Sequence, residues 1–286
     1  MKTDRSLGSG TSWRVWAVRL AAAGMALAWC AGPGVGQTSP GTGQTVLLDA
    51  WYNSQTRKNA AGEVELYHYK WDDMTNSGYS LFGQIWRSDG VETKTLTTAP
   101  TLEKLKDAQY YIIVSPDNAA KNPRPHFMTV EDAGRIARWV RGGGVLLMME
   151  NDPANADIEH MDLLADKFGL HFNNVLVHHV VGDDFPAGRI DLPVPSPPFT
   201  YPHVLYMKDT CSLTLSRHAV PLLKDKTGAL LMGFAKYGRG VAVAVTDPWL
   251  YNEYTDGKKL PAEYDNFAAG QEFVQWLMEE RAKLPR

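Results

Sequence analysis

Residues 129–150 read TVEDAGRIARWVRGGGVLLMME, and this stretch decides the fold class. Thr129 can cap a helix, and Asp132 stands at the reciprocal position of a capping box. The glycines at 142–144 end that helix. The unbroken apolar run that follows, 145–149, is typical of a strand buried on both faces of a sheet. The stretch therefore predicts a helix that leads into a central strand.

The same alternation extends in both directions along the chain. Apolar runs predict further strands at 45–49, 91–96, 110–115, 229–236 and 241–246. Amphipathic or capped segments predict further helices at 76–89, 102–107, 158–168 and 267–283. Strands that alternate with helices indicate an α/β fold, with a mostly parallel sheet and helices on both faces. We expect one such domain over residues 45–286.

One segment of the domain breaks this alternation. Residues 170–216 are rich in proline, above all at 193–198, and contain two short strand-like runs at 176–181 and 204–207. Proline cannot donate a hydrogen bond to a ladder, so it is confined to edges and bulges of sheets. We therefore expect an antiparallel insertion or edge section here.

The N-terminus has the pattern of an export signal. Arg14 and Arg19 precede an apolar run at 20–31, and small residues lead up to Gln37. This pattern predicts a signal peptide at residues 1–36, and a periplasmic or secreted protein. The run is too short for a stable membrane anchor, although an uncleaved anchor is the alternative. Residues 37–44 are predicted to be a flexible polar linker.

Composition narrows the remaining classes. The chain of 286 residues has a formal net charge of −3 and no basic stripe interleaved with aromatics, so we expect no nucleic-acid partner. Trp29 directly before Cys30 argues against lipidation of that cysteine. After cleavage only Cys211 remains, in an apolar stretch, and it is predicted to be a buried structural thiol rather than a nucleophile.

Polar residues follow four of the predicted strands, where ligands bind in open α/β sheets. The segments are 49–53 (DAWYN), 116–118 (PDN), 150–152 (END) and 247–253 (DPWLYNE), and each contains a carboxylate and an asparagine. Such residues also start turns and cap helices, which is the plainer interpretation. Four of them at one sheet edge predict a ligand-binding rim, with four candidate catalytic carboxylates: Asp49, Asp152, Asp247 and Glu253.

Aromatic and basic residues accompany these carboxylates. A sugar ring has an apolar face and a polar rim, which suits stacking aromatics beside carboxylates and amides. Residues 66–83 lead into the first helix, whose N-terminal amides near Ser77 would suit the carboxylate of a uronic acid. The predicted substrate-binding residues are Trp51, Tyr52, Asn53, His68, Lys70, Ser77, Asn151, His160, Trp249, Tyr251, Asn252 and Tyr254.

Paired carboxylates would allow glycosidic hydrolysis by an acid and a base or nucleophile. No GxSxG elbow, P-loop or GxGxxG motif occurs, so we expect no cofactor. The segment 151–160 offers hard oxygen donors for a divalent cation at Asp152, Asn155, Asp157 and Glu159, but in no EF-hand spacing. His160 is alternatively a general base or a helix cap. No metal is assigned.

Four runs resemble one known domain: 47–53 (LLDAWYN), 75–81 (TNSGYSL), 151–157 (NDPANAD) and 247–256 (DPWLYNEYTD). They resemble a domain found beside unsaturated rhamnogalacturonyl or glucuronyl hydrolases in secreted polysaccharide-degrading systems. The resemblance covers nearly the whole mature chain. It implies a fold similar to the class I glutamine amidotransferase-like, or flavodoxin-like, group.

The resemblance has limits that the residues themselves set. The hydrolases resemble α/α-barrels, so their catalytic acids do not carry over to this chain. The amidotransferase cysteine is absent, because the turn after the fourth strand holds Glu150-Asn151-Asp152. The resemblance implies an oligosaccharide ligand of pectin or rhamnogalacturonan type, and a partner glycoside hydrolase. Two functions remain: a glycan-processing hydrolase, or a non-catalytic sugar-binding module.

Overall fold

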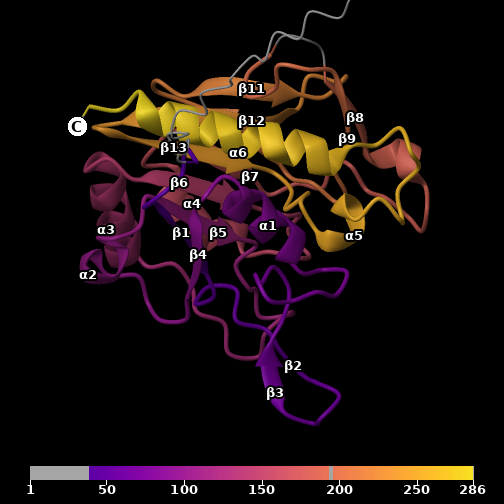
Figure 1. Cartoon of the computed structure of the whole chain (residues 1–286), viewed down its shortest axis with the longest axis horizontal. Helices are drawn as coiled ribbons and strands as arrows, with labels where there is room; N and C mark the ends of the chain where they lie inside the picture. Colours follow the sequence, from indigo (N-terminus) through magenta and orange to yellow (C-terminus); the bar gives the residue numbers. More distant parts are fainter. Residues whose placement is uncertain (1–38, 193–195, 286) are drawn as a thin grey trace, which may run out of the picture. The chain divides into compact units, whose positions relative to one another are not determined.

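The computed structural model describes residues 39–192 and 196–285, which form one compact unit (Figure 1). Its centre is a sheet in which five strands run parallel in the spatial order β4–β1–β5–β6–β13. Four of these strands are apolar, and most of their residues are buried, as expected for strands covered by helices. The strands are β1 (Thr45–Asp49), β4 (Glu92–Leu96), β5 (Tyr110–Val114), β6 (Val145–Met149) and β13 (Gly240–Val245).

Four antiparallel strands extend this sheet beyond β13: β12 (Leu230–Tyr237), β10 (Ser212–Leu215), β7 (Leu170–Asn173) and β11 (Val220–Lys224). Two separate hairpin-like sheets are β2 (Thr56–Lys58) with β3 (Val64–Leu66), and β8 (Arg189–Leu192) with β9 (His203–Tyr206). The α/β class and the antiparallel character of the 170–216 section are thus confirmed.

The helices cover both faces of the sheet (Figure 1). On one face, α1 (Ser80–Ser88) and α6 (Asn266–Ala282) pack over side chains such as Leu48 and Val243. On the other face, α2 (Leu102–Leu105), α3 (Val130–Arg141) and α4 (Ile158–Ala165) pack over Leu146 and Ala244. A short helix α5 (Asn252–Thr255) and a 3₁₀ turn (Phe185–Gly188) complete the described elements. Among these helices none has the length and apolar character needed to cross a membrane.

Local expectations are confirmed where capping chemistry is strong. The Thr129 hydroxyl accepts from the Asp132 amide at 3.1 Å, and α3 begins at the next residue. Residues 176–181, in contrast, form no strand, so that expectation is wrong. There His178 pairs with Asp225 at 3.1 Å and His179 with Asp209 at 2.9 Å, and these side-chain contacts hold the segment in an irregular course.

The N-terminal predictions meet the structure only in part. The signal peptide and Cys30 lie outside the described residues. Residues 39–44 form hydrogen-bonded turns rather than an open linker, since the Gly41 amide donates to the Asp89 carbonyl at 2.8 Å. Cys211 is buried, as expected for a structural thiol, and burial raises its pKa well above the ordinary value.

Candidate functional site

A pocket of about 210 Å³ lies where β1, β5, β6 and β13 end, at the carboxyl edge predicted to bind ligand. Segments far apart in sequence converge on it, because parallel strands bring their following loops to one edge. Its walls are polar and aromatic. The lining residues are Gln55, His68, Tyr69, Ser77, Ser115, Lys121, Asn151, Asn155, Lys208, Asp209, Tyr251, Glu253 and Tyr254. We call it the carboxyl-edge pocket.

Six residues predicted for the site do line this pocket: His68, Ser77, Asn151, Tyr251, Glu253 and Tyr254. The Tyr251 hydroxyl is central to them. It lies 3.0 Å from the Tyr69 hydroxyl and accepts from the Asn151 amide at 3.3 Å. Burial raises the pKa of Tyr69 to about 12, so both phenols are neutral donors and acceptors at physiological pH.

Three of the four candidate catalytic carboxylates lie behind the pocket instead of lining it. Asp49 accepts from the Tyr111 hydroxyl at 2.6 Å and from the Tyr52 amide at 2.7 Å, and burial raises its pKa to about 6. Asp152 accepts from the Ala154 amide at 2.8 Å, as a turn-forming aspartate does.

Asp247 is fully buried and also lies outside the lining. One carboxylate oxygen accepts from the Lys208 amide at 2.8 Å, and the other has no partner among the described residues. Burial raises its pKa well above the ordinary value. For Asp49 and Asp152 the plainer interpretation, a structural turn, fits the geometry better than catalysis, whereas Asp247 bonds a backbone amide far along the chain.

Two further predicted binding residues form a buried strut under the pocket. The Lys70 ammonium donates to the backbone oxygen and the side-chain oxygen of Asn53, both at 2.9 Å, and to the His68 carbonyl at 3.0 Å. The Asn53 amide in turn donates to the Ser115 carbonyl at 2.8 Å. Lys70 is only 2% exposed and its three protons are used, so it positions the pocket wall and does not reach a ligand.

The remaining predicted residues lie elsewhere. Tyr52 and Trp249 belong to the core. Trp51 stacks on His126 with 3.5 Å between ring centroids. His160 pairs with Asp157 at 2.9 Å.

The helix terminus expected to bind a carboxylate is already occupied. α1 begins at Ser80, not near Ser77, and the Asn252 side-chain oxygen accepts from the Leu81 amide at 3.1 Å. The Asn252 amide also donates to the carbonyls of Asp73 and Thr75, each at 2.9 Å. Asn252 is therefore a helix cap and a clamp on the preceding loop.

Asn252→Ala should lower the free energy of unfolding by about 2 kcal/mol, because it removes a cap and leaves the buried Asp73 carbonyl without a donor. Urea unfolding monitored by circular dichroism measures the loss. Asn252→Asp keeps the oxygen that caps α1, so about half of the stability should return. Equal losses in the two variants would contradict a capping role.

Backbone conformation marks the pocket in a way that the sequence does not display. Five non-glycine residues in the described part of the chain have a positive φ, and four of them line this pocket. The left-handed region is costly for such residues and is concentrated at functional sites. The four, with their φ angles, are His68 (59°), Tyr69 (49°), Ser115 (39°) and Asp209 (51°). Of these, only His68 was predicted from sequence.

The lining of the pocket includes two carboxylates and two lysines, which differ in whether they form ion pairs. Glu253 is held by Lys259 at 2.6 Å, and Asp209 by His179 at 2.9 Å, with Lys208 at 3.8 Å. Lys121 forms no ion pair among the described residues. Burial lowers the pKa of His68 to about 4, so its imidazole is neutral at pH 7.

The predicted cation donors do not form a cluster. Among the described residues, the one group of acidic and histidine side chains close enough to share a metal is Asp162, Asp166 and His171. His171 lies 3.0 Å from Asp166 and 3.3 Å from Asp162, as in a small ion-pair network. The segment 151–160 instead uses its donors in turns.

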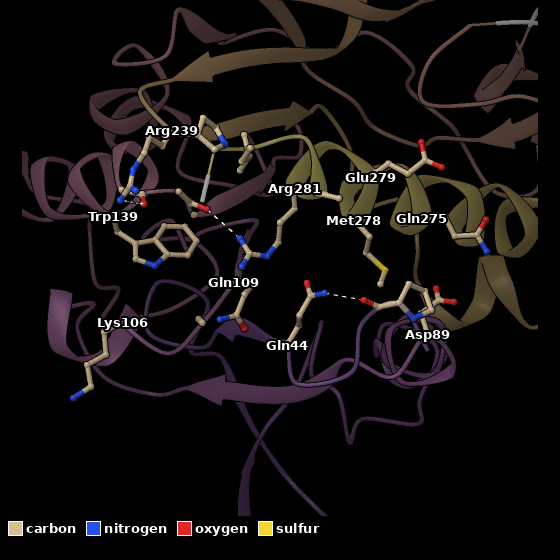
Figure 2. Close-up of a pocket in the computed structure, with 18 of the residues that line it drawn as sticks. Gln44, Asp89, Lys106, Gln109, Trp139, Arg239, Gln275, Met278, Glu279 and Arg281 are labelled. Atoms are coloured by element: carbon tan, nitrogen blue, oxygen red, sulfur yellow. Dashed lines mark hydrogen bonds between the residues drawn. The ribbon is translucent and has the colours of Figure 1, made fainter. Parts of the chain in front are cut away.

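A larger hollow of about 1030 Å³ lies at the opposite end of the parallel strands, beside the C-terminal turns of α3 and α6 (Figure 2). Several of its polar groups are already paired within the protein. Arg281 donates to the Gly143 carbonyl at 3.3 Å, Arg239 to the Gly142 carbonyl at 3.0 Å, and Gln44 to the Pro40 carbonyl at 2.9 Å (Figure 2). Size alone does not make it the better candidate, since few polar groups remain to orient a ligand.

Comparison with known proteins indicates the fold and nothing finer. No family model and no curated protein matches the sequence. The N-terminal domain of mmIFT52 superposes with a TM-score of 0.60 at 18% identity, covering 82% of this chain and 97% of that one. A β-galactosidase from Bacillus circulans sp. alkalophilus superposes with a TM-score of 0.51 at 11% identity, and the match covers 85% of this chain and 32% of that one. The cytoplasmic protein STM1381 from Salmonella typhimurium LT2 gives 0.50 at 13%, covering 85% and 100%.

Proposed function

We propose that this chain is a carbohydrate-binding module that holds the acidic end of a uronic-acid-containing oligosaccharide in the carboxyl-edge pocket. The observation that carries the proposal is the lining itself: three tyrosines, Tyr69, Tyr251 and Tyr254, beside amides and charged groups. Tyrosine rings offer an apolar surface to the C–H face of a sugar, and their hydroxyls meet its polar rim. The volume, below the range usual for drug-sized ligands, suits one terminal sugar unit.

The charges of the pocket favour an acidic sugar. Glu253 is already paired with Lys259, and Asp209 contacts His179 and, at 3.8 Å, Lys208, whereas Lys121 has no ion-pair partner among the described residues. A ligand carboxylate would complete this arrangement through charge-assisted hydrogen bonds. We therefore attribute the preference for an acidic ligand to Lys121 and Lys208, and not to the N-terminus of α1.

Other features support the same setting. The family resemblance of the four sequence runs points to pectin or rhamnogalacturonan-type glycans and to a partner glycoside hydrolase. The strand order β4–β1–β5–β6–β13 is the 2-1-3-4-5 order of flavodoxin-like sheets, in which ligands bind at the switch beside β1. The arginine-flanked apolar run at the N-terminus supports a periplasmic or secreted location.

Titration calorimetry with a matched pair of oligosaccharides, one ending in a uronic acid and one in the neutral sugar, tests the proposal. Lys121→Met should weaken binding of the acidic ligand about tenfold, the loss of roughly one charge-assisted hydrogen bond, and leave the neutral ligand unchanged. Lys226→Met, an exposed lysine outside the pocket, is the control and should have no effect. Equal affinity for the two ligands would refute acid recognition.

Hydrolysis of a glycosidic bond is the second candidate, favoured by the two carboxylates, Asp209 and Glu253, that line one strained pocket. Such chemistry needs an acid together with a base or nucleophile across the sugar. Release of reducing sugar from rhamnogalacturonan or glucuronate-capped oligosaccharides distinguishes the two functions. Release that Asp209→Asn abolishes would establish the enzyme, and binding without release establishes the module.

A further inference from the structure

A second hollow, of about 600 Å³, lies between the C-terminal ends of α3 and α4. It shares no residue with the carboxyl-edge pocket. Four cationic side chains line it: Arg138, Arg141, Lys167 and Arg217. We call it the cationic groove. In a chain with a formal net charge of −3, this local concentration of positive charge requires an explanation.

Neighbouring acids do not neutralise the groove. Asp162 and Asp166 are the two carboxylates in its lining, and both contact His171, at 3.3 and 3.0 Å. Asp162 also accepts from the Phe172 amide at 2.8 Å, and burial raises its pKa to about 7. None of the four cations forms an ion pair with a carboxylate within residues 39–192 and 196–285.

The plainer explanation is that cations at helix C-termini complement the helix dipole. It accounts for Arg217, whose guanidinium donates to the Lys167 carbonyl at 2.9 Å just beyond α4. Arg138 and Arg141 also lie in the last turn of α3, where the dipole favours their charges, but their guanidinium groups bond none of the described carbonyls there. The carbonyls at the end of α3 are met instead by Arg239, on Gly142, and by Arg281, on Gly143.

Arg138 and Arg141 therefore remain free for a ligand. Neither guanidinium donates a hydrogen bond to any group in the part of the chain that the structure describes. Both residues are exposed and lie one turn apart on α3, so they present their charges on the same side of the helix.

The walls of the groove are held by packing. Tyr237 packs edge-on against Phe168, with 5.0 Å between ring centroids. Gly238, at φ 62°, brings the turn between β12 and β13 so close to Arg141 that a side chain there would overlap it. Arg217 has a φ of 57°, and is the one left-handed non-glycine residue, of those described, outside the carboxyl-edge pocket. Strain of this kind is found where a fold fixes a functional side chain.

We propose that the cationic groove binds a ligand that carries a dianionic oxyanion group, phosphate or sulfate. Guanidinium groups pair with such groups through two parallel hydrogen bonds. The lining has four cations and two carboxylates, and both carboxylates already contact His171. This excess of positive charge favours a dianion over a monoanion. The volume lies within the range of small-molecule sites. This proposal does not depend on the function of the carboxyl-edge pocket.

Titration of the full chain with sulfate, phosphate and acetate at constant ionic strength, followed by calorimetry, tests the groove. Sulfate or phosphate should bind at least five times more tightly than acetate. Arg138→Gln and Arg217→Gln should each weaken that binding at least fivefold. Arg138→Lys keeps the charge but loses the two parallel hydrogen bonds. Its affinity for sulfate or phosphate should therefore lie between that of Arg138→Gln and that of the parent protein.

Arg124→Gln is the matched control, because Arg124 is exposed and lines neither pocket. An equal loss in this variant, or equal affinity for acetate, would overturn the proposal. Thermal melting establishes that each variant is folded. Comparison of free sulfate with glucose 6-sulfate then distinguishes the two sources of the group: tighter binding of the ester identifies a sugar ester, and equal binding a free ion.

Discussion

Glu150→Gln is expected to stabilise the protein at neutral pH. The Glu150 carboxyl follows β6, is fully buried, and neither of its oxygens has a partner among the described residues. Burial, with repulsion from Asp162 and Asp157, raises its pKa well above the ordinary value of 4.5. The folded protein therefore keeps a proton that the unfolded chain releases.

The sign of the pH dependence follows from that difference in proton binding. As pH rises above 4.5, the unfolded state is favoured by about 1.4 kcal/mol per pH unit, until the folded carboxyl also titrates. Glutamine has no proton to release. The variant should therefore match the parent protein near pH 4.5 and exceed its unfolding free energy by up to about 3 kcal/mol at pH 7.

Urea unfolding of both proteins at the two pH values measures this difference, since all other groups titrate alike. Glu263→Gln, at an exposed position, is the control and should show no pH-dependent gain. A loss of stability in Glu150→Gln at pH 7 would mean that the carboxyl is ionised and held by a group or ion that pairs with it.

Lys70→Met should destabilise the protein, and by more than Glu150→Gln stabilises it. The substitution fills the same volume but removes the donor to three buried oxygens, two on Asn53 and one on His68. It also removes the positive charge that faces Asp49 and Asp117. Unpaired buried acceptors and carboxylates cost about 1–3 kcal/mol each, so we expect a loss of about 4 kcal/mol.

The same variant should abolish ligand binding in the carboxyl-edge pocket, because it releases the carbonyl of His68, a left-handed residue of the pocket wall. Urea unfolding gives the loss of stability, and calorimetry below the new melting temperature gives the loss of affinity. Lys226→Met serves again as the control. Stability within about 1 kcal/mol of the parent would show that Lys70 is not a structural strut.

The parallel half of the sheet was predictable because its strands are continuous apolar runs between capped helices. Thr45–Asp49 and Val145–Met149 were predicted to the residue. Short polar strands were missed: β2 has the sequence TRK, which no periodicity distinguishes from a loop. The run 176–181 was misassigned, because its histidines bond to aspartates far along the chain, a tertiary effect outside any local pattern.

The location of the site was predictable from the sequence, but the residues that line it were not. Parallel topology alone puts the strand-following loops at one edge, and six predicted residues do meet there. Topology does not say which side of a loop faces the ligand. Asp49, Asp152 and Asp247 turn inward to satisfy backbone amides, whereas Lys121 and Lys208 come from segments with no motif.

The left-handed residues around the carboxyl-edge pocket bear on how this protein can diversify. A cavity shaped by main-chain conformation keeps its outline when individual side chains on its walls are exchanged. Mutational drift at Lys121 or Tyr254 could then alter which molecules are accepted without requiring a new scaffold. Relatives of this chain would share the framework and differ in the ligands that they bind. Laboratory selection should find new specificities most readily at these two wall positions, with the strained positions left unchanged.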